Sequence, residues 1–150
     1  GDLLLVTGME SDPALERTVL SLPTVRGVRP VTLLNRYVGD LADHSVFRQN
    51  GVPYLFLSCG PSRHYHKPSD TPDRLDYRKM AGIADLLEAM VRDVAERELR
   101  GPWEGYDTTA TDLRTMRATV GPIVRMLGAK LEGRADIDRV AELVKGRLGL

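Results

Sequence analysis

The stretch from Asp76 to Val94 constrains the fold more than any other part of the sequence, because it carries the most regular apolar pattern in the chain. Asp76 is a suitable N-cap for a helix. The apolar positions that follow are Met80, Ile83, Ala84, Leu87, Met90, Val91 and Val94. They recur at the spacing of a helix that has one apolar side. We interpret this stretch as a long helix that packs against the core, and Gly101-Pro102 as the break after it.

Short apolar runs alternate with helical patterns in the first half of the chain, which is typical of an α/β fold. Ser11 or Asp12 can cap a helix that has Pro13 in its first turn and that Pro23 ends. Strands are expected at residues 3–6, 31–34 and 52–58, with a short helix at residues 43–50 and a long loop at residues 59–75.

The pattern beyond residue 100 is helical. We expect one helix from about residue 111 to 130, kinked at Gly121-Pro122, and a last helix that begins after Asp136. We therefore divide the chain into an α/β part, residues 1–100, and a helical tail, residues 101–150.

Composition excludes some classes of partner. Among 150 residues the 21 basic and 21 acidic side chains give no net charge, which argues against a nucleic-acid surface. No apolar run reaches the roughly 18 residues of a membrane span. The single cysteine, Cys59, excludes an internal disulfide, and we interpret it as a small buried residue at the end of a strand. Because the chain starts at Gly1 with a strand-like run, we expect its natural beginning to lie upstream.

The loop after the third expected strand carries the residues most suited to chemistry. His66, with Asp70 four residues later, could be a zinc ligand whose second ring nitrogen is oriented by a carboxylate. The spacing alone favours the other interpretation, a loop histidine that is hydrogen-bonded to that carboxylate. Tyr65 could donate a hydrogen bond to an oxyanion, or pack at the base of the loop. His64 is interpreted as structural or at the rim.

A second acid and imidazole, Asp43 and His44, open the expected short helix. One interpretation is an N-cap aspartate followed by a partly buried histidine. The other is a pair that supports a site or forms the wall of a pocket. The residues themselves leave both interpretations open.

Three segments together resemble the C-terminal half of the co-catalytic zinc aminopeptidases (clan MH), a group that also includes glutamate carboxypeptidase-like and glutaminyl cyclase-like proteins. The segments are Asp43-His44-Ser45-Val46-Phe47, Gly51-Val52-Pro53 and Tyr65-His66-Lys67-Pro68-Ser69-Asp70-Thr71-Pro72-Asp73-Arg74-Leu75-Asp76-Tyr77. The resemblance covers residues 40–95 well and residues 1–35 more loosely.

This resemblance implies a partial, mixed β-sheet with flanking helices, followed here by a helical tail. It implies two zinc ions, held by five ligand residues at the carboxyl ends of strands, and a glutamate as general base. His66 stands at the position of the last zinc ligand, and Tyr65 at that of a tyrosine that stabilises the tetrahedral intermediate. Asp70 stands at a supporting position.

The other ligands of the group belong upstream of the part that matches residues 1–8. A catalytic zinc typically needs about three protein ligands, so we expect this chain alone to be inactive. The first hypothesis is therefore the C-terminal part of a zinc exopeptidase, most simply an aminopeptidase acting on peptides. Alternatives are a non-catalytic interaction module and a glutaminyl cyclase-like acyltransferase. We also expect self-association through sheet edges or the helical tail.

Overall fold

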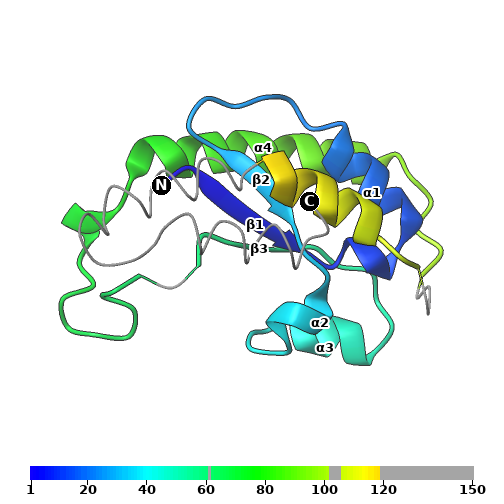
Figure 1. The fold of residues 1–150 in the computed structure, drawn as a ribbon, viewed down its shortest axis with the longest axis horizontal. Coiled ribbons are helices and arrows are strands. Elements are labelled where there is room, and N and C mark those ends of the chain that lie inside the picture. The colour runs from blue at the N-terminus through cyan, green and yellow to red at the C-terminus, as the bar shows by residue number, and fades with distance from the viewer. Residues whose placement is uncertain (61, 102–105, 119–150) are drawn as a thin grey trace.

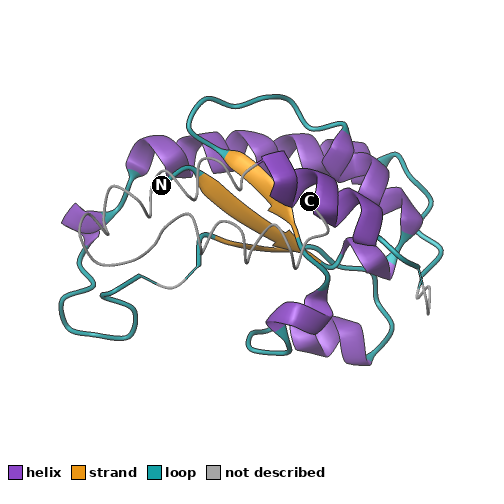
Figure 2. Ribbon diagram, viewed as in Figure 1, coloured by secondary structure: helices purple, strands orange, loops and turns teal. Residues whose placement is uncertain are grey.

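The computed structural model describes residues 1–60, 62–101 and 106–118, and in it three strands form one mixed sheet. The strands are β1 (Leu3–Thr7), β2 (Arg29–Thr32) and β3 (Phe56–Ser58). β1 is central, parallel to β2 and antiparallel to β3. Helices flank the sheet, as Figure 2 shows, which confirms the predicted α/β class with a mixed sheet.

Two helices pack together on one face of the sheet and form the core with it (Figure 1). They are α1 (Pro13–Leu20) and α4 (Tyr77–Ala95). The core cluster joins Leu4 and Val6 of β1, Val19 of α1, and Leu86 and Met90 of α4. The smaller elements are η1 (Met9–Ser11), α2 (Asn35–Val38), α3 (His44–Gln49) and η2 (Pro72–Arg74).

Local capping explains where the two main helices begin. The Asp12 carboxylate accepts a hydrogen bond from the Ala14 amide at 2.7 Å, and Pro13 occupies the first turn of α1. The Asp76 carboxylate accepts one from the Lys79 amide at 3.0 Å at the start of α4. Both predicted N-caps are confirmed.

The apolar pattern of α4 predicted the helix correctly, but the prediction of which of its residues are buried was partly wrong. Leu86 and Met90 are buried, and Gly82 lies so close to Val25 and Val28 that an added Cβ would come within 2.8 and 2.9 Å of their side chains. Met80, Ala84, Leu87 and Val91, which the spacing assigned to the core, are instead exposed. A second apolar stripe therefore runs along α4 outside the core.

Strand β3 is shorter than the predicted residues 52–58 because the backbone amides before it have other partners. The Val52 amide donates to the Phe47 carbonyl at 2.9 Å, and the Tyr54 amide donates to the Ser11 hydroxyl at 2.9 Å. Pro53 between them has no amide hydrogen. These residues therefore cannot extend the ladder with β1. Cys59, directly after β3, is exposed, so the expectation that it is buried was wrong.

Strand β2 lies two residues earlier than the predicted residues 31–34. The Arg29 amide donates to the Asp2 carbonyl just before β1, and the Leu33 amide donates to Val6 of β1. The backbone nitrogens at the alternate positions, Pro30 and Thr32, therefore point away from β1. Pro30 has no N–H to lose there. The Thr32 amide donates to the Thr115 hydroxyl at 3.1 Å, which leaves this edge without a free amide donor.

Residues 109–118 are helical, in agreement with the start of the helix expected at 111–130; the rest of that helix and the one after Asp136 lie outside the described residues. This part of the chain contacts the α/β part. Tyr106 and Thr111 donate hydrogen bonds to the Glu16 carboxylate, and Thr115 reaches Thr32. The division at residue 101 stays a prediction.

We expect the exposed stripe of α4 to contribute to self-association. Met80, Leu87 and Val91 are 48%, 42% and 66% exposed, and adjacent exposed apolar side chains favour burial against another surface. Leu87→Glu should shift the chain toward monomer by about tenfold or more in dissociation constant, measured by sedimentation equilibrium. Ala81→Glu, an exposed position on the same helix outside the stripe, is the matched control. A chain that is already monomeric at high concentration contradicts this expectation.

Candidate functional site

The residues singled out from the sequence fall at opposite ends of the strands. Because β3 is antiparallel to β1 and Ser58 pairs with Leu5, the loop after β3 leaves toward the beginning of β1. α2 and α3 follow β2 at the other end, where β1 ends and β3 begins. Figure 1 shows the green loop of residues 62–75 well separated from the cyan α2 and α3. The structure therefore does not bring His44 and His66 together.

Tyr65 and His66 are neighbours in space as well as in sequence. Their rings stack with centroids 3.9 Å apart and planes inclined by 19°. Both side chains are exposed, and His66 has a left-handed backbone with φ of 56°. Such a conformation in a residue with a side chain costs free energy and is found most often at functional sites. The pair presents a phenol and an imidazole to solvent side by side.

Asp70 lies in the same loop and is exposed. Its amide donates to the Lys67 carbonyl at 2.9 Å and closes a turn. Although both residues are described by the structure, the Asp70 carboxylate makes no hydrogen bond to His66. The hydrogen bond between Asp70 and His66 that the sequence suggested is thus not formed.

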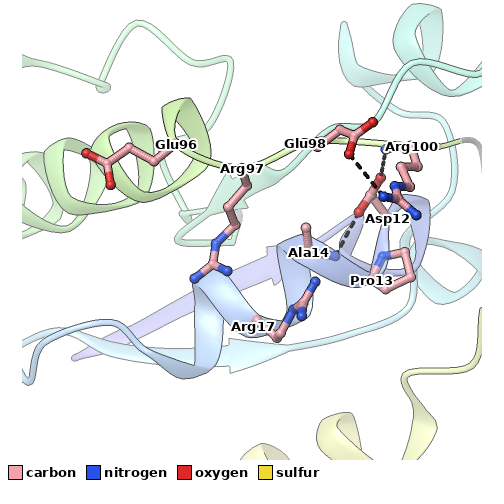
Figure 3. A pocket seen from close by; sticks show the side chains of 8 residues that line it. All are labelled: Asp12, Pro13, Ala14, Arg17, Glu96, Arg97, Glu98 and Arg100. Carbon is pink, nitrogen blue, oxygen red and sulfur yellow. Dashed lines mark hydrogen bonds and ion pairs between the residues drawn. The ribbon is translucent and has the colours of Figure 1, made fainter.

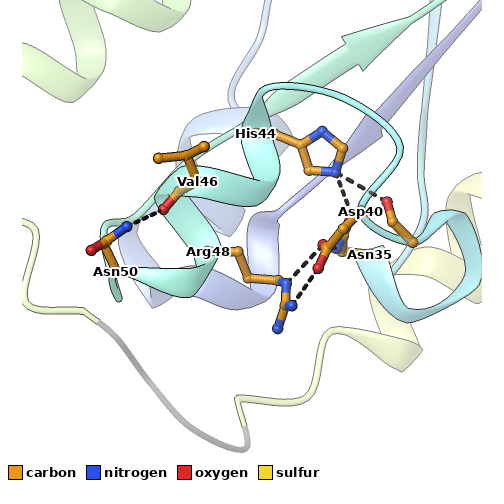
Figure 4. Close-up of polar contacts among 7 residues, drawn as sticks. Asn35, Asp40, His44, Val46, Arg48 and Asn50 are labelled. Carbon is orange, nitrogen blue, oxygen red and sulfur yellow. Dashed lines mark hydrogen bonds and ion pairs between the residues drawn. The ribbon is translucent and has the colours of Figure 1, made fainter.

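His44 is buried at the opposite end of the strands, in a polar network with α2 (Figure 4). Its Nε2 lies 3.1 Å from the Asn35 Oδ1 and 3.2 Å from the Gly39 carbonyl. Since both neighbours are acceptors, we assign the ring proton to Nε2. The ring also stacks on Phe56 at a centroid distance of 4.3 Å.

Asn35, which sequence reasoning missed, holds this network together. Its amide donates to the Glu10 carboxylate at 2.5 Å, and its side-chain nitrogen donates to Asp40 at 3.3 Å. Arg48 donates to the same Asp40 carboxylate and holds its pKa below the usual range. No sequence signal marks Asn35, because its partners come from three different segments. Asp43 occupies the N-cap position of α3 but makes no side-chain capping bond.

Tyr54 packs next to this network and should make the fold sensitive to alkali. Burial, with a further contribution from the Glu10 carboxylate, raises the pKa of Tyr54 to about 12. A folded pKa above the unfolded value of about 10 adds stability that is fully present below pH 10 and is lost as pH rises through 12. We expect urea midpoints to fall over this interval.

Tyr54→Phe should flatten this alkaline decline while keeping the ring packing, whereas Tyr77→Phe, at an exposed tyrosine, should not. Urea unfolding at a series of pH values measures both variants. An alkaline slope that is equal in Tyr54→Phe and the parent chain contradicts the assignment.

A pocket of about 500 Å³ lies between the start of α1 and the end of α4 (Figure 3). Four of its six charged side chains have partners within the protein. Arg97 binds Asp93 through two hydrogen bonds, Arg100 binds Glu98, and Asp12 accepts hydrogen bonds from backbone amides. We regard this pocket as a structural joint between α1 and the segment after α4.

Within the described residues no three histidine, cysteine or acidic side chains are grouped closely enough to hold a metal ion. His66 offers one imidazole in an exposed loop, and about three protein ligands are typical of a catalytic zinc. The residues described here therefore do not by themselves form a zinc site. Among them, no helix is both long and apolar enough to cross a membrane.

Comparison with known proteins places the chain in a class. Residues 4–91 match the model of Peptidase family M28, and the chain belongs to this metallopeptidase family, whose members typically bind zinc. It is also similar to the uncharacterized protein YfbL of Escherichia coli (strain K12), with 37% identity over 49 residues. That match covers 31% of this chain and 15% of the relative, so the chain spans a minor part of that protein. The search of solved structures gave no significant match.

Proposed function

We propose that the chain is the C-terminal part of a zinc-dependent exopeptidase, an aminopeptidase, that is inactive without the remainder of its catalytic domain. The observation that carries the proposal is the family match over residues 4–91, which includes the exposed Tyr65–His66 pair. A zinc-bound water is the nucleophile that such a metal supplies when it is held by a complete set of ligands.

In this proposal His66 provides one of the zinc ligands, and the others come from outside the chain. Its imidazole is exposed and therefore accessible to such an ion. Tyr65, whose ring stacks on that imidazole, would supply a phenol able to donate a hydrogen bond to an oxyanion next to the metal. A single donor of this kind typically contributes about 100-fold to 1,000-fold in turnover.

The remaining candidates act at greater distance. Asp70 supports the fold of the loop through its turn with Lys67. His44 supports the start of β3, since its ring stacks on Phe56, and Asp43 precedes it at the N-cap position of α3.

The proposal is tested by measuring zinc content and hydrolysis of peptides with a free amino end, in this chain and in the longer protein that contains it. We expect stoichiometric zinc and activity in the longer protein, and neither in this chain alone. Absence of both from the longer protein contradicts the proposal.

A non-catalytic interaction module is the second candidate. It is favoured by the exposed apolar stripe of α4 and by the lack of a full set of metal ligands among the described residues. A longer protein that lacks zinc and hydrolysis but binds a partner through α4 would support this candidate instead.

A further inference from the structure

Two arginines of the loop between β3 and α4 converge on one imidazole nitrogen. Arg63 Nε lies 3.0 Å from His64 Nε2, and an Arg74 guanidinium nitrogen lies 3.4 Å from the same atom. The two residues are separated by most of the loop, so the loop fold brings their cations together. This cluster lies directly beside Tyr65 and His66 in the sequence.

The contacts of His64 allow its tautomer to be assigned. An arginine can only donate, so we assign His64 Nε2 as the acceptor and place the ring proton on Nδ1. In this tautomer His64 Nδ1 donates to the Ser69 hydroxyl at 2.9 Å. An imidazole carries no negative charge, so it does not offset either guanidinium. Lys67 adds a third positive charge, with its ammonium donating to the Arg63 carbonyl at 2.9 Å.

No carboxylate of the described residues neutralises this cluster. Elsewhere in the same structure Arg48, Arg92 and Arg97 each bind an acidic side chain within 3 Å. Arg63 and Arg74 form no such pair, although Asp70 and Asp73 lie in the same loop. Two adjacent cations without a counter-charge repel each other, and an anion placed between them removes that repulsion.

We propose that Arg63 and Arg74 form a binding site for a free carboxylate of the peptide substrate. Guanidinium groups bind carboxylates through paired, charge-assisted hydrogen bonds, and two of them can hold both oxygens in a fixed orientation. Peptides present such a group at the carboxyl end or on aspartate and glutamate side chains. The site rests on the proposed function for the identity of its ligand, and it adds a requirement for negative charge close to the Tyr65–His66 pair.

The test is to titrate this chain, without metal, with small carboxylates and to monitor the NMR signals of the arginine Nε–H groups. The probes are N-acetylglycine, which has a terminal carboxylate, the α-amide of N-acetylaspartate, which has a side-chain carboxylate, and uncharged N-acetylglycinamide. We expect saturable shifts of Arg63 and Arg74 with one or both carboxylates and none with the amide. The tighter carboxylate identifies the terminal or the side-chain source.

The double variant R63Q/R74Q should raise the dissociation constant at least about tenfold, because it removes both charged donors. R78Q, at an exposed arginine of α4, is the matched control and should bind as the parent chain does. Equal binding of amide and carboxylate, or equal loss in R78Q, overturns the proposal. All three positions are exposed, so folding of each variant can be verified independently by its NMR spectrum.

This titration separates the two proposals. Carboxylate binding to this chain does not depend on zinc or on turnover, so it can succeed where the longer protein proves inactive. Conversely, an active longer protein whose fragment shows no carboxylate binding rejects the arginine site alone.

Discussion

His66→Ala in the longer protein should abolish stoichiometric zinc binding and lower peptide hydrolysis by at least about 100-fold. Removing a residue that only hydrogen-bonds to a metal ligand already costs up to about 100-fold in metal affinity or activity, and here the proposed ligand itself is removed. His66 is exposed, and its side chain contributes no buried contact to the core. The variant should therefore keep its stability. Zinc analysis, kcat/KM and thermal unfolding measure the three quantities on one preparation.

Two companion variants make this result specific. Tyr65→Phe should retain zinc and lower kcat more than it raises KM, since the phenol acts on the transition state. Arg78→Ala, at an exposed position of α4 outside this loop, should retain both zinc and activity. Full zinc content and full turnover in His66→Ala would remove His66 from the metal site and with it the central part of the proposed function.

Asp12→Ala should lower the free energy of unfolding by roughly 3 kcal/mol, since it leaves several amides without an acceptor. Asp12 is 2% exposed, and one of its oxygens caps α1 through the Ala14 amide. The other oxygen accepts hydrogen bonds from the Arg100 amide at 2.6 Å and the Gly101 amide at 2.9 Å. One buried carboxylate thus joins the start of α1 to the segment that follows α4.

Asp76→Ala is the matched control for this effect, because Asp76 is exposed and caps only α4. It should cost about 1 kcal/mol, the usual value for an N-cap. Asp12→Asn should fall between the two, since its amide group can accept through one atom only. Urea unfolding at neutral pH measures all three, and an Asp12→Ala effect no larger than that of Asp76→Ala contradicts the bridging role.

The position of the candidate residues could be predicted only in part. Residue types and spacing marked Tyr65, His66 and His44 as chemically interesting. They did not show that His44 and His66 lie at opposite ends of the strands, because this depends on β3 running antiparallel to β1. The convergence of Arg63 and Arg74 on His64 likewise depends on the three-dimensional course of the loop.

The sequence by itself determined the elements whose causes are local. Asp12 and Asp76 cap their helices through amides two or three residues away, and the apolar run at residues 3–6 forms a strand, as its pattern predicted. Tertiary structure decided what depends on distant partners. Pro30 is accepted in β2 because its backbone nitrogen points away from β1, where no amide hydrogen is needed for the ladder. β3 is short because the Tyr54 amide donates to the Ser11 hydroxyl. Which apolar side of α4 is buried was decided in the same way, because periodicity defines a stripe but only packing against the sheet selects Leu86 over Leu87.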